Sequence, residues 1–177
     1  MKRAIYEAIC ACFGMEPGSE EASVLIREAY QEPENTPRPP RNADVIYYTV
    51  QTDGMNEEAP AAYERVHQTW TVHRFCPWTL LIVCYGPQAV SNAGKIRSFL
   101  FLDGYSLPRS ILRKAGIYPV PEPKAPMEIY EPEGSLWRKR ADLTIALRVE
   151  EEMVHPTSID RVNSTPEIIV HDWQPMR

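Results

Sequence analysis

The sequence has no long apolar run and no cysteine framework. No segment reaches the roughly 18 apolar residues that a membrane helix needs, so we expect no membrane partner. The four cysteines, Cys10, Cys12, Cys76 and Cys84, have the spacing of neither a disulfide scaffold nor a zinc site. We therefore expect reduced thiols, in a protein assembled in the cytoplasm.

The chain also lacks an excess of basic residues and a glycine-rich phosphate loop. Nineteen Lys and Arg against 24 Asp and Glu give a formal charge of −5, which disfavours a protein that grips nucleic acid through many phosphate contacts. Residues 86–96 contain two glycines and a Gly-Lys pair, but seven residues separate the glycines and Ile96 follows the lysine. A P-loop needs four intervening residues and then Lys-Ser/Thr, so we expect no nucleotide cofactor.

No catalytic or metal-binding constellation can be assembled from the motifs. His67 and His73 share one strand parity, yet no carboxylate or cysteine stands at a metal-ligand or acid/base spacing from them. No serine elbow is present, and Cys84 belongs to an apolar run that would bury an inert thiol. We expect no catalytic residue, no metal and no cofactor.

What the chain does contain is an apolar strand followed by an amphipathic helix. Residues 78–85 predict a strand buried on both faces, and Gly86-Pro87 ends it. From Ala89 the period changes to three and four residues, which predicts a helix whose stripe packs back on the sheet. The expected core comprises nine residues of this unit and a later alternating strand: Leu80, Ile82, Cys84, Val90, Ile96, Leu100, Leu143, Ile145 and Leu147.

Periodicity along the rest of the chain predicts an α/β (α+β) single domain with a mixed, mainly antiparallel sheet flanked by helices. Helices are expected over 2–13, from Ser19 to about Tyr30, and over 107–113. Strands are expected over 44–52, 63–75, 117–120, 127–130, 142–150 and 167–170. Cys76-Pro77 is expected to form a tight turn between antiparallel strands, and residues 131–139 a loop. Residues 31–42 form a proline-rich connector.

The one strong basic cluster is Trp137-Arg138-Lys139-Arg140. It is either a solvated strand start or an electrostatic contact with an acidic partner subunit, because Trp and Arg are favoured interface anchors. With no catalytic constellation in view, an assembly component is favoured over an enzyme. A small non-viral adaptor and a small enzyme without a known motif stay open as alternatives.

Three motifs of the sequence resemble those of a known protein family. The first is Tyr85-Gly86-Pro87-Gln88-Ala89, followed by Ala93, Ile96, Arg97 and Leu100. This strand-turn-helix, the lead-in at Pro37 to Pro40 before Tyr47-Tyr48, and the late Trp137…Arg140-Ala141-Asp142-Leu143-Thr144 resemble the tail (neck) terminator proteins of tailed bacteriophages. The resemblance covers residues 1–155, the expected domain. Residues 156–177 are expected to form a C-terminal extension or arm.

The resemblance implies a structural virion protein of the neck or tail. Such proteins form a homo-oligomeric ring, six-fold, between the connector (head completion) proteins and the tail tube, with genomic DNA passing through without sequence-specific binding. Each ring subunit needs two different complementary surfaces. The residues we expect at those surfaces are Trp137, Arg138, Arg140, Ile168 and Trp173.

Overall fold

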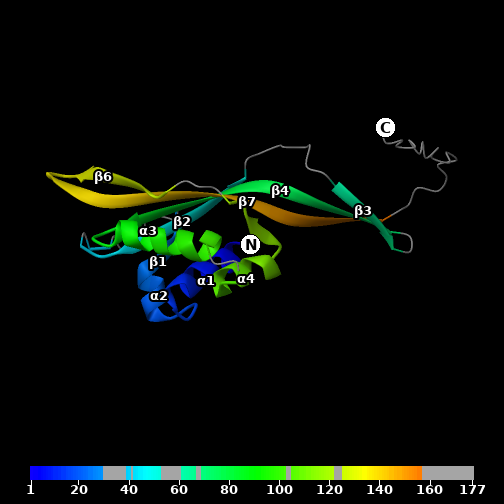
Figure 1. Cartoon of the computed structure of the whole chain (residues 1–177), viewed down its shortest axis with the longest axis horizontal. Coiled ribbons are helices and arrows are strands. Elements are labelled where there is room, and N and C mark those ends of the chain that lie inside the picture. Colours follow the sequence, from blue (N-terminus) through cyan, green and yellow to red (C-terminus); the bar gives the residue numbers. More distant parts are fainter. Residues whose placement is uncertain are drawn as a thin grey trace, which may run out of the picture.

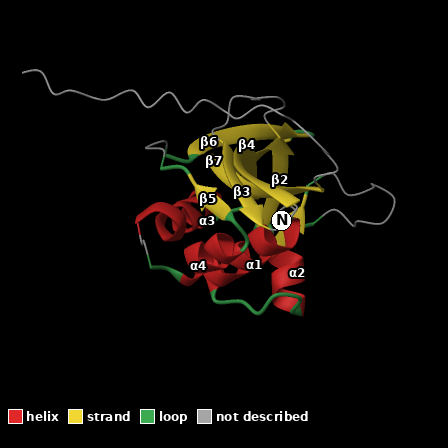
Figure 2. Ribbon diagram, turned by 90° about the vertical axis from the view of Figure 1, so that its right-hand side faces the viewer, coloured by secondary structure: helices red, strands yellow, loops and turns green. Residues whose placement is uncertain are grey.

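The computed structural model describes residues 1–29, 39–40, 42–52, 61–66, 69–102, 105–121 and 125–156. They form one α+β domain in which a mainly antiparallel sheet carries a layer of helices (Figures 1 and 2). The helices are α1 (Lys2–Phe13), α2 (Glu20–Leu25), α3 (Ala89–Arg97), the π-helical turn η1 (Ser98–Leu102) and α4 (Leu107–Lys114). The strands are β1 (Ile26–Glu28), β2 (Val45–Thr52), β3 (Ala61–Val66), β4 (Thr69–Tyr85), β5 (Ile117–Pro119), β6 (Met127–Glu133) and β7 (Leu136–Pro156).

Helix α1 begins and ends near the residues that the sequence indicates, and α2 begins where it indicates. Gly14 adopts the left-handed conformation at φ 68° and ends α1, as glycine does at many helix C-termini. The Ser19 hydroxyl accepts a hydrogen bond from the Ala22 N–H at 3.2 Å and caps α2. The expectation that this helix runs to Tyr30 is wrong, because α2 stops at Leu25 and Ile26 starts β1, which pairs in parallel with β2.

Two long antiparallel strands organise the sheet. All 17 residues of β4 pair with β7, from Thr69 opposite Pro156 to Tyr85 opposite Arg140. On the outer side of β4 lie β2 at one end and β3 at the other, and β7 carries β6 and β5 on its own outer side. The result is a two-stranded ribbon flanked by β2 and β6 at one end, by β5 near its middle and by β3 at the other end. Figure 1 shows the β3 end running past the helices.

The expected turn at Cys76-Pro77 is wrong, because β4 passes straight through it. Pro77 pairs with Arg148 of β7, whereas β2 stops opposite Trp78 and β3 starts opposite Arg74. Among the described strands β7 is thus the only neighbour of Pro77, and a residue without an N–H donor is tolerated where one side of a strand is unpaired.

The expected loop over residues 131–139 is also wrong. β6 continues to Glu133 and β7 starts at Leu136, so Gly134 and Ser135 form a two-residue hairpin turn. Gly134 has φ 66°, the positive value that tight hairpin turns require. This hairpin places Trp137, Arg138 and Arg140 on a strand.

The core lies between the helices and one face of the sheet. Eight of the nine expected core residues are buried, and Val90 is half-buried against them. Ile5 and Ile9 of α1 complete the layer. The expectation that residues 78–85 are buried on both faces is wrong. Leu80, Ile82 and Cys84 are buried under the helices, whereas Leu81 and Val83 on the opposite face are only half-buried.

No helix among the described residues combines the length and the apolar character needed to span a bilayer. Most of the connector at 31–42 and all of residues 157–177 lie outside the described residues.

Candidate functional site

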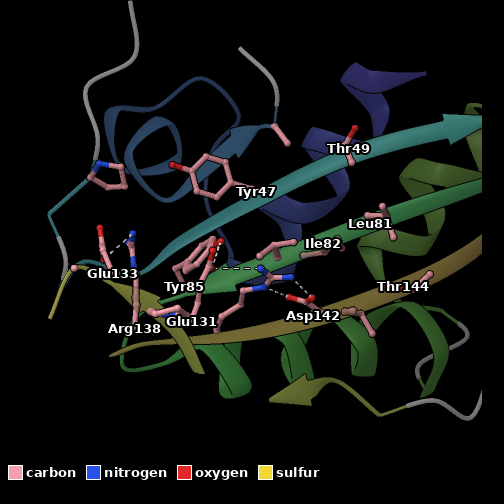
Figure 3. Close-up of a pocket in the computed structure, with 17 residues that line it drawn as sticks. Tyr47, Thr49, Leu81, Ile82, Tyr85, Glu131, Glu133, Arg138, Asp142 and Thr144 are labelled. Atoms are coloured by element: carbon pink, nitrogen blue, oxygen red, sulfur yellow. Dashed lines mark hydrogen bonds and ion pairs between the residues drawn. The ribbon is translucent and has the colours of Figure 1, made fainter. Parts of the chain in front are cut away.

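The face of the sheet turned away from the helices is hollowed at its β6 end. The hollow has a volume of about 820 Å³ and is lined from four strands, β2, β4, β6 and β7, with Ala29 and Pro39 at its margin (Figure 3). We call it the trough. Its polar side chains are Tyr47, Thr49, Tyr85, Glu131, Glu133, Arg138, Arg140, Asp142 and Thr144. Strand alternation explains the members on β2, β4 and the later part of β7, because each of those positions is one residue away from a core position.

Arg140 is held by two carboxylates inside the trough. Its Nε and Nη2 donate to Oδ1 and Oδ2 of Asp142 at 2.6 Å and 2.5 Å, which is a two-point ion pair. Its Nη1 lies 3.3 Å from Glu131 Oε2. These contacts raise the pKa of Arg140 above its ordinary value, and the hydrogen bonds to Asp142 contribute most. Arg140 is therefore engaged within its own chain.

Arg138, two residues earlier on the same face, is held differently. Its guanidinium stacks over the Tyr85 ring at 4.6 Å from the ring centroid, a cation–π contact. Its Nη1 lies 4.0 Å from Glu133 Oε2, and its side chain is only 13% exposed. Its Nε and Nη2 are shielded from solvent and have no hydrogen-bond acceptor among the described residues. In Arg140, the corresponding Nε and Nη2 atoms both donate hydrogen bonds to Asp142.

Tyr85 connects the two arginines. Its hydroxyl donates to Glu131 Oε2 at 2.8 Å, and Tyr47 meets its ring edge-on with centroids 6.0 Å apart. Burial and the Glu131 hydrogen bond raise the pKa of Tyr85, while nearby Arg140 lowers it in part. Tyr85 is thus a neutral hydrogen-bond donor at ordinary pH, packed between aromatic and cationic neighbours.

The β6–β7 hairpin exposes large apolar side chains beside the trough. Trp137 is 67% exposed, and Met127, Tyr130 and Leu136 are each more than half exposed. Trp137 and Tyr130 lie on the opposite face of the hairpin from the trough, where Lys139 forms an ion pair with Glu128 at 3.2 Å. A hairpin with exposed aromatic side chains is typical of a protein–protein contact surface.

The basic cluster of the sequence is therefore divided between two faces. Arg138 and Arg140 point into the trough and Trp137 and Lys139 point away from it, and each of the three cations lies within 4.0 Å of a carboxylate. Ile168 and Trp173 lie outside the described residues.

Sequence reasoning missed Tyr47, Tyr85, Glu131 and Asp142 as members of one site. They come from four different strands, and only the register between the strands brings them together. The one available signal was strand parity, which places Asp142 on the same face as Arg138 and Arg140.

Among the described residues, no cysteine or histidine lines the trough. Burial raises the pKa of Cys12 and of Cys84 to about 12, which keeps both as thiols. His73 Nδ1 lies 3.9 Å from Glu150 Oε1, and His67 lies outside the described residues. Within the described part of the chain, no three His, Cys, Asp or Glu side chains converge on a point where a metal ion could bind. The arrangement is suited to holding another chain.

Comparison with known proteins agrees with a contact-forming role. The chain matches the family described as phage neck terminator protein over residues 1–173, almost its whole length. No curated protein matches the chain. A match of this extent shows the family: the chain belongs to the phage neck terminator proteins, structural components of the bacteriophage neck.

Proposed function

We propose that the chain forms a closed homo-oligomeric ring, six-fold, at the junction of head and tail, where it terminates or joins the tail and lets genomic DNA pass. The observation that carries this proposal is the long β4–β7 ribbon, which bears different structures at its two ends. One end holds the trough and the exposed hairpin, and the other holds β3 and extends beyond the helices (Figure 1). A head-to-tail ring needs such a pair of unlike surfaces on each subunit.

The exposed hairpin side chains support one of the two contacts. Trp137 and Tyr130 expose more than half of their surface although most aromatic side chains of a single domain are largely buried. Aromatic residues and arginine are enriched in interface cores. We assign Trp137, Arg138 and Arg140 to the subunit contact on the trough side, and residues 156–177, with Ile168 and Trp173, to the other partner surface.

Charge supports passage of DNA without tight binding. The net charge is −5, and a carboxylate of the chain lies within 4.0 Å of each of Arg138, Lys139 and Arg140. A lumen lined by such a protein would not hold the phosphates, because tight non-specific binding needs several unmatched Lys or Arg side chains. The proposed partners are the connector proteins on the head side and tail proteins on the other, with no cofactor and no catalytic step.

Imaging tests the proposal directly. A reconstruction of the virion should place this chain in a ring around the DNA axis, with its basic residues off the duplex. Negative-stain images of the purified protein at high concentration should show annular particles. A virion in which the chain lies elsewhere, or in which Arg138 and Arg140 clamp the duplex, would refute the proposal.

A further inference from the structure

Arg138 has two N–H groups for which the described chain supplies no acceptor, although its Nη1 lies 4.0 Å from Glu133 Oε2. The Nε and Nη2 groups of an arginine form a fork that matches the two oxygens of a carboxylate. In the trough, Arg140 has this fork filled by Asp142, whereas the fork of Arg138 has no acceptor among the described residues. Because both N–H groups are shielded from solvent, leaving them without an acceptor is costly. An acceptor that enters the trough would remove this cost.

The other charges of the trough select a peptide over a nucleic acid. The trough contains Glu131, Glu133 and Asp142 beside its two arginines, so it carries more negative than positive charge and would repel a polyanion. A mainly apolar strand that brings one or two carboxylates meets much weaker repulsion than a nucleic acid with a charge on every phosphate. The tyrosine pair and the exposed sides of Leu81 and Val83 give such a strand an apolar floor.

One segment of this chain has that chemistry. Residues 167–173 read Glu-Ile-Ile-Val-His-Asp-Trp, with carboxylates at Glu167 and Asp172 separated by three apolar residues and His171. The segment lies beyond Pro156, the last described residue, and the family match extends through residue 173. A Trp beside a carboxylate suits a cavity lined by tyrosines and an arginine.

Chain length favours a neighbouring copy as the source of the segment. Along β7, Arg138 lies about 60 Å from Pro156 at about 3.4 Å per residue. A fully extended chain from Pro156 reaches at most about 40 Å to Glu167 and about 58 Å to Asp172. Glu167 therefore falls well short of the Arg138 of its own chain, and Asp172 would come near only along a perfectly straight path.

We propose that the segment Glu167–Trp173 of one copy lies in the trough of a neighbouring copy, with Glu167 or Asp172 paired to the Arg138 fork and Trp173 against the tyrosines. This proposal names one contact of the ring proposed above and rests on that self-association. It makes the trough a docking site for a second copy of this chain. It also gives the C-terminal segment a partner that lies within the same ring.

Binding of the isolated segment tests the docking. A fluorescein-labelled synthetic peptide of residues 157–177 is titrated into the full-length protein and followed by anisotropy. We expect saturable binding that Arg138→Lys weakens about tenfold or more, because lysine keeps the charge and loses the fork. Arg148→Lys, an exposed arginine on the same face of β7 outside the trough, is the matched control and should leave binding unchanged. The peptide carrying Glu167→Gln and Asp172→Asn should bind weakly to both proteins. Absence of binding at millimolar peptide, or equal binding by the Arg138→Lys protein, overturns the proposal.

A second measurement locates the contact and separates it from the ring itself. Benzoylphenylalanine is placed at position 173, and a one-to-one mixture of ¹⁵N-labelled and unlabelled chains is irradiated at high concentration. Cross-links between chains of different label, to peptides of β4, β6 or β7 at the trough, support the docking. Cross-links only within one chain, or none at the trough, refute it. If electron micrographs show rings but the cross-links fall outside the trough, the docking is refuted and the ring stands. If the cross-links fall at the trough but the virion reconstruction shows no ring, the ring is refuted and the docking stands.

Discussion

Asp44 and Gln88 are 44 positions apart, and the Asp44 carboxylate accepts a hydrogen bond from the Gln88 backbone N–H at 2.8 Å. The contact joins the residue before β2 to the start of α3, whose first N–H groups have no partner within the helix. It lies over Gly86, whose φ is 104°. A Cβ atom at Gly86 would lie 2.8 Å from both the Ala43 carbonyl oxygen and the Asp44 Cα. The turn that separates strand from helix is therefore also the point where two segments of backbone touch.

Gly86→Ala should destabilise the protein strongly. The substitution adds backbone strain at a positive φ and a clash with Ala43 and Asp44, so we expect a loss of roughly 2–4 kcal/mol in the free energy of unfolding. Urea denaturation measures it. Gly134→Ala is the matched control, because Gly134 has φ 66° with no atom within 4 Å of a new Cβ, and should lose about 1 kcal/mol. Equal losses would mean that the close approach at Gly86 is misplaced.

Asp44→Ala should remove the cap on α3 and cost about 1 kcal/mol in the free energy of unfolding. Asp44→Asn keeps an acceptor oxygen near the Gln88 N–H, so its loss should be smaller. Thermal melts of the two variants against the parent give the order. If asparagine costs as much as alanine, the hydrogen bond to Gln88 contributes nothing to stability.

Ile82→Ala tests the centre of the core. Ile82 is 1% exposed near the C-terminal end of β4, opposite Leu143, and truncating it should cost about 2–5 kcal/mol in the free energy of unfolding. Leu81→Ala, one residue away on the half-buried trough face, should cost clearly less. Chemical denaturation of both variants decides the matter, and a reversed order would place the core on the wrong side of the sheet.

The Arg74–Glu151 pair should make stability depend on acid pH. Arg74 Nε and Nη2 lie 3.1 Å and 2.8 Å from Glu151 Oε2. The hydrogen bonds from Arg74, and after them one from Cys76, lower the pKa of Glu151 below its ordinary value of 4.5. A carboxylate whose pKa is lower in the folded state stabilises the protein at pH values above its unfolded-state pKa. This stabilisation is lost as the pH falls through the folded-state pKa. The melting temperature should therefore drop below about pH 4.5, and less so in Glu151→Gln. Glu16→Gln, at an exposed position, should keep the parent profile.

Trp137→Ser should impair assembly and leave the fold intact. Because Trp137 is 67% exposed, its loss should change the free energy of unfolding by no more than about 0.5 kcal/mol. Under the proposed function it should reduce ring formation, measured by sedimentation or by counting annular particles. Tyr105, 99% exposed away from the hairpin, provides the control Tyr105→Ser. Full assembly by the Trp137 variant would remove the hairpin from the interface.

The parts of the fold that the sequence predicts are those in which a local signal agrees with the tertiary structure. Gly14 and Ser19 delimit helices through their own backbone and hydroxyl chemistry, and the alternation of Leu143 to Val149 follows from burial on one face. The helical stripe that ends at Leu100 is predicted for the same reason.

The errors occur where distant pairing overrides local preference. Pro77 indicates a break, but β7 pairs with Arg74 to Leu80 without interruption. Ile26 continues a helical pattern, but its pairing with Ile46 of β2 makes it a strand. Residues 131–139 are rich in turn-forming types, but only Gly134 and Ser135 turn. The trough was unpredictable for a related reason, because its members are brought together by strand register over long separations in the chain.

The β4–β7 ribbon also determines the order in which the protein can fold. Pairing Tyr85 with Arg140 closes a shorter stretch of chain than pairing Thr69 with Pro156, and the entropic cost of closure grows with the length closed. The hairpin at Gly134 forms locally and presents the start of β7 to the end of β4. We expect the ladder to propagate from the trough end toward β3, with refolding times of milliseconds to seconds, as is usual for sheets made of non-local pairs. The trough is then complete before the far end of the ribbon is.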